Sequence, residues 1–294
     1  MVDRVYVQIP AYRDRELPHT LRALFEQARH PERLRVAVAW QYGADELHVE
    51  PSLRRWGDVE IVKIPAEHSE GCNWARRLLQ ERWRGERYTL FLDSHHRFAP
   101  GWDDDAIAML EGLRSSGVAR PILTGYLPPY DPHTDPLGRA STILRIRPLE
   151  RHDGLLFRLV GDPVPEGPQR AAPLPARFAS LHFLLADGSF NEELAIDASI
   201  YFFADEIAIA LRAYTHGYDL FHPHRILGWH LYDRATRVTH WNDHAHWQAQ
   251  NEVSCERVRA LYRGEVRDPY GVGTARTIAD YEALIGESLV VQGG

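Results

Sequence analysis

Hydrophobic and polar positions alternate over residues 1–125 in blocks that are typical of strands and helices in turn. Short apolar runs predict buried strands over residues 4–10, 35–41, 59–64, 88–93 and 121–125. Apolar residues at helical spacing predict helices between them, over residues 17–29, 73–83 and 104–113. Strands and helices that alternate in this way are typical of right-handed βαβ units. We therefore predict an α/β protein with a central, mainly parallel sheet and helices on both faces.

The second half of the chain departs from this alternation. Two proline-rich stretches predict loops, and strands are expected between residues 140 and 186. Helical periodicity returns over 205–216, where Gly217 is suited to end the helix, and further helices are predicted over 253–263 and 277–285. We expect one sheet-centred domain over residues 1–242 and a C-terminal helical extension over residues 243–294 that packs on it.

Composition and charge narrow the function classes. Lys and Arg total 34 against 41 Asp and Glu, a formal net charge of -7, which argues against non-specific nucleic-acid binding. No apolar run approaches the roughly 20 residues of a membrane span, and the first residues lack the pattern of a signal peptide. The two cysteines, Cys72 and Cys255, cannot build a disulfide framework. We therefore expect a cytoplasmic protein without a nucleic-acid partner or a membrane span.

Ligands of such sheets bind beyond the carboxyl ends of the strands, so the residues there are candidates for chemistry. Asp93, Ser94 and His95 follow the apolar run 88–92. Asp and His two residues apart can share one face of an extended segment and offer an oxygen and an imidazole to a divalent ion. His230, which follows another strand-like run, could supply a third ligand. Mn²⁺ (or Mg²⁺) would suit this mixed set together with a diphosphate, while an ordinary turn is the alternative.

Two further groups flank this candidate metal site. Tyr232, Arg234 and Arg237 follow His230 and could hydrogen-bond phosphate oxygens. Asp205 and Glu206 begin a predicted helix, where one acid is accounted for by the helix N-terminus. A second acid is not needed for that role. We therefore predict that these two carboxylates are catalytic, holding sugar hydroxyls or stabilising positive charge at an anomeric carbon.

The nucleotide side is predicted around the first two strands. After the first strand, Tyr12 could stack on a base, Arg13 could face a phosphate and Asp14 could accept from a base N–H, although a surface loop would look the same. The other candidates for nucleotide contact are Pro10 and Gln41, which lie at strand ends, and Arg76. Arg76 lies in a predicted helix whose N-terminus could approach an anion. Motifs of P-loop NTPases, dinucleotide-binding dehydrogenases, α/β-hydrolases and zincins are absent.

A series of motifs in order from residue 4 to about 242 resembles one known family. The segments that carry the resemblance include Ile9–Asp14, Leu24–Ala28, Val38–Gln41, Gly71–Arg76, Asp93–Phe98, Phe202–Ile207 and Tyr214–Asp219. They are similar to the hydroxyproline-directed cytoplasmic N-acetylglucosaminyltransferases and, through the D-x-H motif, more distantly to the polypeptide N-acetylgalactosaminyltransferases. The resemblance implies a GT-A fold, a UDP-sugar donor, a divalent metal on Asp93, His95 and His230, and retention of anomeric configuration.

The chain departs from the family pattern at a few positions. Ala204 replaces a glycine, and the shorter Asp205 replaces a glutamate. Leu181 lies about where the relatives' F-W-A-A-G-F pattern has its glycine, so a larger side chain could exclude an N-acetyl group. We expect a metal-dependent retaining glycosyltransferase that moves GlcNAc or a related hexose to a hydroxyl of a peptide, protein or natural product. The alternative is a UDP-sugar-binding or glycan-binding protein of the same fold without turnover.

Overall fold

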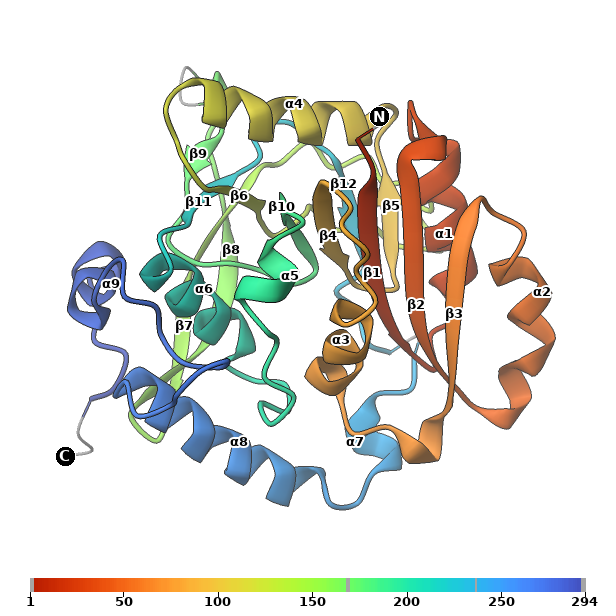
Figure 1. The fold of residues 1–294 in the computed structure, drawn as a ribbon. Coiled ribbons are helices and arrows are strands. Elements are labelled where there is room, and N and C mark those ends of the chain that lie inside the picture. Colours follow the sequence, from red (N-terminus) through yellow and green to blue (C-terminus); the bar gives the residue numbers. More distant parts are fainter. Residues whose placement is uncertain (1–2, 168–169, 236, 292–294) are drawn as a thin grey trace.

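The computed structural model describes residues 3–167, 170–235 and 237–291 (Figure 1). Its centre is an eight-stranded sheet with the strand order β3-β2-β1-β4-β10-β6-β11-β9. β1 to β4 are parallel to one another, and only β10 and β9 run against the others. The predicted mainly parallel sheet is therefore confirmed. The strands are β1 (Val5–Tyr12), β2 (Leu34–Tyr42), β3 (Asp58–Pro65), β4 (Tyr88–Leu92), β6 (Pro121–Thr124), β9 (Leu174–Pro175), β10 (Phe183–Asp187) and β11 (Asp219–His222).

Helices cover both faces of this sheet because its strands bury side chains on both sides. Val5 and Val7 of β1 pack with α1 and α4, whereas Tyr6 between them packs with α3. This is the two-residue alternation of a strand. The helices are α1 (Leu17–Glu26), α2 (Glu50–Leu53), α3 (Cys72–Gln80), α4 (Trp102–Ser115), α5 (Phe190–Glu193), α6 (Asp205–Thr215), α7 (His240–Asp243), α8 (Trp247–Tyr262) and α9 (Ile278–Ile285). Among the described residues, no helix is both long and apolar enough to span a lipid bilayer.

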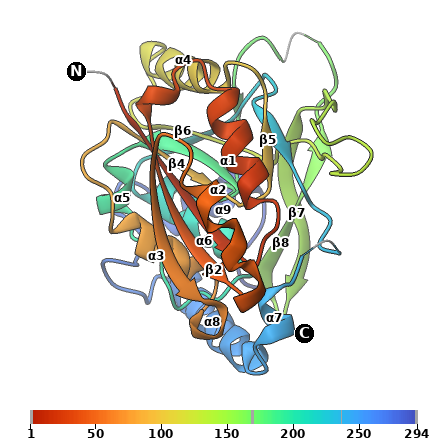
Figure 2. The same cartoon turned by 90° about the vertical axis from the view of Figure 1, so that its right-hand side faces the viewer.

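Two small sheets flank the main one. β5 (His96–Phe98) pairs with β12 (Gly228–His230), and β7 (Leu144–His152) pairs with β8 (Leu155–Pro163). Figure 2 shows the β7–β8 hairpin standing beside the main sheet. The strand-like run before His230 corresponds to β12. The sequence did not reveal β5, because three residues are too few for a periodic signal.

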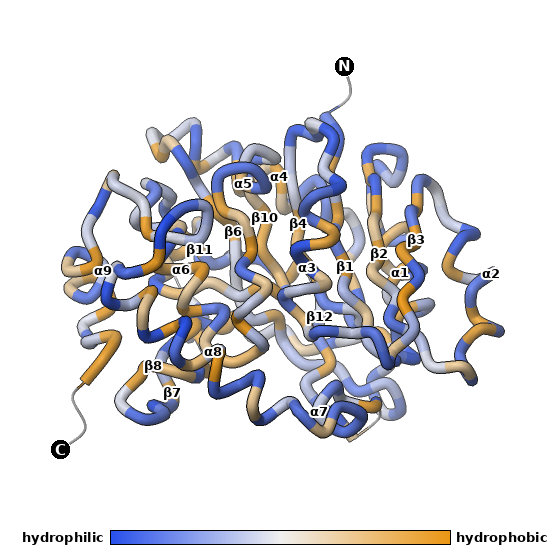
Figure 3. The backbone as a smooth tube through the Cα atoms, turned by 60° about the horizontal axis from the view of Figure 1, so that its bottom comes forward, coloured by the Kyte–Doolittle hydropathy of each residue, from blue (hydrophilic) through white to orange (hydrophobic). Residues whose placement is uncertain are grey.

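The hydrophobic stretches gather in the strands, as the hydropathy colours of Figure 3 show. The largest core cluster joins α6 of the central part to Val258 and Leu261 of α8 and Tyr281 of α9. The C-terminal helices thus share one core with the sheet. The expected boundary after residue 242 falls inside α7.

Ala204, directly before α6, has a left-handed backbone conformation that glycine would adopt more easily. Ala204 precedes the helix with φ 65° and is 4% exposed. The left-handed conformation destabilises a residue with a Cβ by about 1–2 kcal/mol. Glycine avoids this cost, but its greater freedom in the unfolded chain lowers the free energy of unfolding by about 0.4–1 kcal/mol. Ala204→Gly should therefore raise the free energy of unfolding in urea by up to about 1 kcal/mol. The same change at Ala208 inside α6 should lower it by about 1 kcal/mol; equal losses at both positions would contradict the strain.

A buried histidine in the sheet predicts a loss of stability in acid. His222 is fully buried, donates from Nδ1 to the Thr124 carbonyl at 2.9 Å and accepts at Nε2 from the Ile146 N–H at 3.3 Å. Burial lowers the pKa of His222 to about 4. The unfolded chain therefore takes up this proton near pH 6.5, before the folded protein does. Stability from this residue is complete above pH 6.5 and is lost as the pH falls toward 4.

The loss attributable to His222 amounts to about 3 kcal/mol, since one pKa unit corresponds to about 1.4 kcal/mol. Denaturant unfolding at pH 7.5 and pH 4.5, in the presence of a chelator, measures it. His222→Gln keeps a donor for the Thr124 carbonyl but does not titrate. Its free energy of unfolding should therefore fall less between these two pH values, and an unchanged pH dependence would contradict the assignment.

Candidate active site

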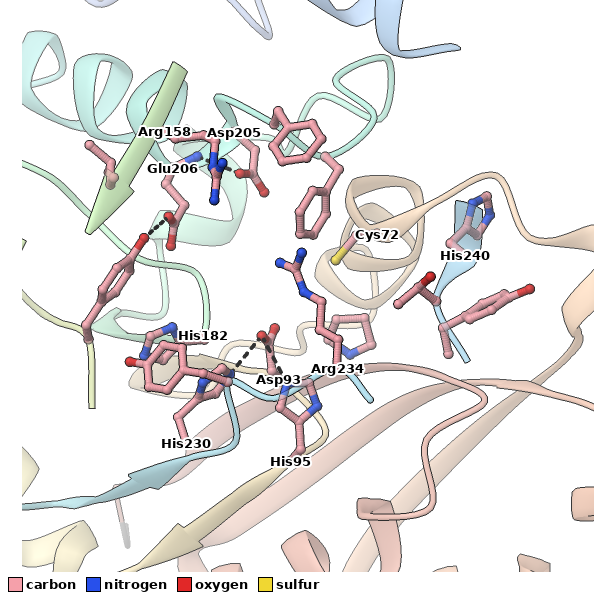
Figure 4. Close-up of a pocket in the computed structure, with 18 of the residues that line it drawn as sticks. Cys72, Asp93, His95, Arg158, His182, Asp205, Glu206, His230, Arg234 and His240 are labelled. Atoms are coloured by element: carbon pink, nitrogen blue, oxygen red, sulfur yellow. Dashed lines mark hydrogen bonds and ion pairs between the residues drawn. The ribbon is translucent and has the colours of Figure 1, made fainter. Parts of the chain in front are cut away.

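Three side chains that could bind a metal ion converge at the carboxyl end of β4. Asp93 and His95 follow that strand, and His230 is the last residue of β12. Because β12 pairs with β5, His230 lies opposite His96. One ligand atom from each of the three residues lies within 4.8 Å of the others. The Nε2 atoms of His230 and His95 lie 3.3 and 3.8 Å from Asp93 Oδ2 (Figure 4). The structure thus brings together all three predicted ligands.

The electrostatics of this cluster fit a divalent cation. Although burial opposes it, hydrogen bonding from His230 and the charge of Arg76 hold the pKa of Asp93 well below its usual range. Burial and the neighbouring His182 keep the pKa of His230 well below its usual value. The cluster therefore offers a carboxylate and neutral imidazole at neutral pH, the donor set that suits Mn²⁺ and similar ions.

A cavity of about 680 Å³ opens over this cluster. Its wall includes nearly all of the other residues that the sequence suggested, namely Pro10, Tyr12, Asp14, Gln41, Arg76, Ser94, Asp205, Glu206, Tyr232 and Arg234. The lining also includes residues of the β7–β8 hairpin and the aromatic side chains of Phe157, Phe202, Phe203 and Trp241. The cavity therefore combines charged and apolar side chains.

Arg76 connects the metal cluster to the acids of α6. Its guanidinium lies 3.2 Å from Asp93 Oδ1 and 2.9 Å from Asp205 Oδ2, and its side chain is 6% exposed. Because it pairs with a carboxylate of each group, Arg76 bridges the metal cluster and the acids of α6 within the protein. The sequence had suggested a nucleotide contact for it.

The two acids of α6 differ in their surroundings. Asp205 is held by Arg76, whereas Glu206 accepts from the Tyr126 hydroxyl at 2.6 Å. Burial and the adjacent Asp205 raise the pKa of Glu206 to about 7. Glu206 faces Asp93 across the cavity (Figure 4). A carboxyl group that titrates near neutrality in a cavity is a candidate for a catalytic role.

The predicted nucleotide side is partly built as expected. Tyr12 lines the cavity and donates from its hydroxyl to Asp243 Oδ2 at 2.8 Å. Its ring lies 5.0 Å from that of His240, which stacks on His244 at 3.8 Å. Gln41 is buried at the end of β2 and accepts a hydrogen bond from the Ser69 hydroxyl.

Arg13 and Asp14 are both held by partners within the protein. Arg13, with φ 44°, does not line the cavity; its guanidinium pairs with Asp243 at 2.9 Å and Asp45 at 3.5 Å. Asp14 lines the cavity, and its carboxylate already accepts from Ser94, His95 and the Glu16 N–H. Although burial opposes it, the pKa of Asp14 is lowered to about 2 by His95, Arg237 and Ser94.

Leu181 also differs from its predicted place. Its side chain is 1% exposed in the main hydrophobic core, whereas the next residue, His182, lines the cavity. Counted from the phenylalanines at both ends of the F-W-A-A-G-F pattern, the relatives' glycine falls on His182. The side chain that replaces the glycine at the cavity is therefore the imidazole of His182 and not the side chain of Leu181.

Sequence reasoning missed His182 and Tyr126. His182 stacks on His230 with ring centroids 4.2 Å apart, and Tyr126 lies against both His182 and Glu206. Aligning the two phenylalanines of the F-W-A-A-G-F pattern with Phe178 and Phe183 could have identified His182 as the residue at the glycine position. Tyr126 lies in a proline-rich segment without periodicity, where no pattern singles it out.

Comparison with known proteins identifies the family. A model of the family described as "Glycosyltransferase (GlcNAc)" matches residues 4–51 and 43–290. The chain belongs to this glycosyltransferase family. A search of curated protein sequences gave this glycosyltransferase no significant match.

Solved structures share the fold of this glycosyltransferase. A crystal structure of GalNAc-T7 with UDP, GalNAc and Mn²⁺ has a TM-score of 0.61 at 14% identity, over 97% of this chain and 55% of that chain. TarS residues 1–349 from S. aureus, in complex with UDP-GlcNAc, has a TM-score of 0.54 at 12% identity, over 96% and 70% of the two chains. Both confirm the expected GT-A fold; the chain spans little more than half of the GalNAc-T7 chain.

Proposed function

We propose that this glycosyltransferase is a metal-dependent retaining enzyme that transfers GlcNAc or a related hexose from a UDP-sugar to a hydroxyl. The observation that carries the proposal is the convergence of Asp93, His95 and His230 on one point beneath the cavity. GalNAc-T7, which shares the fold, was solved with UDP and Mn²⁺. TarS was solved with UDP-GlcNAc. These two structures support a UDP-sugar donor here.

The three ligands would hold Mn²⁺ or Mg²⁺ against the diphosphate of the donor. When bound, such an ion acts as a Lewis acid that stabilises the negative charge of the leaving UDP. Arg234 contributes a second positive charge. Among the described residues it has no carboxylate within ion-pair distance, and its guanidinium rests on the rings of Phe202 and Trp241. Figure 4 shows it pointing into the cavity, where it can donate to phosphate oxygens.

The proposed retention would need no strong protein nucleophile. The leaving phosphate oxygen would take the acceptor's proton on the face where the bond to the sugar breaks. Asp205 and Glu206 would hold sugar hydroxyls or stabilise positive charge at the anomeric carbon. Tyr12 and Gln41 line the nucleotide end of the cavity, while the aromatic wall of the β7–β8 side would receive the acceptor on a peptide, protein or natural product. We place the reaction in the cytoplasm.

The alternative of a binding protein without turnover rests on two departures from the family pattern. Ala204 keeps the backbone turn that a glycine would adopt, with φ 65°. The second departure falls on His182, which lines the cavity, and not on Leu181, which lies in the core. The test of the donor below therefore includes UDP-hexoses other than UDP-GlcNAc.

Release of UDP tests the proposal. The purified protein is incubated with UDP-GlcNAc and other UDP-hexoses, with Mn²⁺ or with a chelator, and free UDP is measured by a coupled assay. We expect slow hydrolysis of at least one donor with Mn²⁺, faster release when a hydroxyl acceptor is added, and none with the chelator. Binding of UDP-sugars without release under all conditions would favour the alternative.

A further inference from the structure

Asp14 lies where it can control the imidazole of His95. β1 and β4 are neighbouring parallel strands, so their carboxyl ends meet at one edge of the sheet. Asp14 follows the first strand and His95 the second. His95 Nδ1 lies 2.6 Å from Asp14 Oδ2, and the side chains are 8% and 3% exposed. This is a buried contact between a carboxylate and an imidazole.

The partners of His95 define which of its nitrogens carries the proton. Arg237 contacts His95 Nε2 through its guanidinium, which can only donate. Nε2 must therefore be the acceptor, and the ring proton of the neutral imidazole must lie on Nδ1. That proton points at Asp14 Oδ2, so both contacts require the same tautomer. His95 Nε2 lies 3.8 Å from Asp93 Oδ2.

The carboxylate of Asp14 is itself held in place. Its Oδ2 also accepts from the Ser94 hydroxyl at 2.6 Å, and its Oδ1 accepts from the Glu16 N–H at 2.9 Å. Three donors thus fix the carboxylate in one orientation. His230, by contrast, has a buried Nδ1 without a partner among the described residues, and its ring is held by stacking on His182.

We propose that Asp14 is a positioning residue that keeps His95 in the Nδ1–H tautomer, so that the unprotonated Nε2 can bind a metal ion in place of the Arg237 guanidinium. Buried carboxylates on metal-binding histidines commonly have this role. The inference rests on the proposed function in that it takes His95 as a metal ligand.

Asp14→Asn tests the proposal because an amide cannot reproduce all three contacts. If its oxygen faces His95, its NH₂ group meets the Glu16 N–H, donor against donor. If its NH₂ group faces His95, the ring proton must move to Nε2, where it blocks metal binding. We expect the affinity for Mn²⁺ alone, measured by calorimetry, to fall 10- to 100-fold.

A matched variant separates this effect from a general loss of stability. Asp103 is also a buried aspartate, and it accepts from the N–H groups of Arg29 and His30 at 2.7 and 2.9 Å, away from the cavity. Asp103→Asn should lower the free energy of unfolding but leave Mn²⁺ affinity within about threefold. Equal losses of affinity in both variants would overturn the proposal.

The tautomer can also be observed directly in the unmodified, metal-free protein. Two-bond ¹H–¹⁵N spectra of the ¹⁵N-histidine-labelled protein distinguish the two neutral tautomers, and His95→Gln assigns the signal. We expect the Nδ1–H form of His95; the Nε2–H form would overturn the proposal even if Asp14→Asn fails to fold. Wild-type protein that binds no Mn²⁺ would contradict the proposed function, while this spectrum would still decide the role of Asp14.

Discussion

Replacing His95 with alanine is expected to abolish Mn²⁺-dependent binding of UDP. The described residues offer three candidate ligands to a metal ion, so removing one would take away a direct bond to the ion. The loss should therefore be at least about 100-fold, beyond the 10- to 100-fold typical of residues that only support a ligand. Calorimetric titration of UDP in the presence of Mn²⁺ measures it.

Two further variants serve as controls for His95→Ala. His95→Gln fills more of the buried space beside Asp14 and reduces the risk of unfolding, yet it should lose the same affinity. His246→Ala makes the same chemical change at an exposed position and should bind UDP as the wild type does. Unchanged UDP affinity in both His95 variants would exclude this residue from the metal site.

Replacing Glu206 with glutamine is expected to lower kcat by about 10²–10³-fold while leaving the Kd for UDP within about threefold. Glutamine keeps an acceptor for the Tyr126 hydroxyl but carries no charge. The carboxylate is proposed to act on the sugar or acceptor and not on the diphosphate. The change should thus appear in turnover and not in nucleotide affinity.

The pH dependence of kcat gives a second readout of Glu206. Its pKa is raised to about 7, so the group is mostly protonated below pH 7 and mostly ionised above it. If the carboxylate is the active form, kcat of the wild type should rise with pH through about 7. That rise should be absent in Glu206→Gln.

Two comparisons interpret the Glu206 result. Glu192→Gln changes an exposed acid in the first turn of α5 and should leave kcat unaltered. Asp205→Asn should also reduce kcat, but it breaks a buried ion pair with Arg76 and will lower stability as well. A parallel loss of UDP affinity in Glu206→Gln would assign these acids a structural role.

The periodic elements of the fold were predictable because their signal is local. Alternating apolar runs and amphipathic helices located β1 to β4, β6, α1, α3, α4 and α6 within a few residues. The position of Asp93 and His95 followed from the end of β4. That His230 lies beside them could also be predicted, because His230 follows a strand-like run and the family resemblance indicated it as the third ligand.

What could not be predicted depends on contacts between distant segments. The pairing of β12 with β5 brings His230 to the site, but β5 has only three residues and leaves no pattern in the sequence. Asp14 and Arg76 line the cavity, but each is held by buried partners from other elements, which no local pattern reveals. A sequence shows which side chains carry charge; it does not show which of them neutralise one another.

A crystal structure with Mn²⁺ and UDP, using anomalous scattering to locate the ion, tests the central claim most directly. We predict one strong anomalous peak within bonding distance of Asp93, His95 and His230 and beside the diphosphate of UDP. UDP bound in the cavity with no peak at these three side chains, or with the ion held elsewhere, would contradict the metal site and the mechanism built on it.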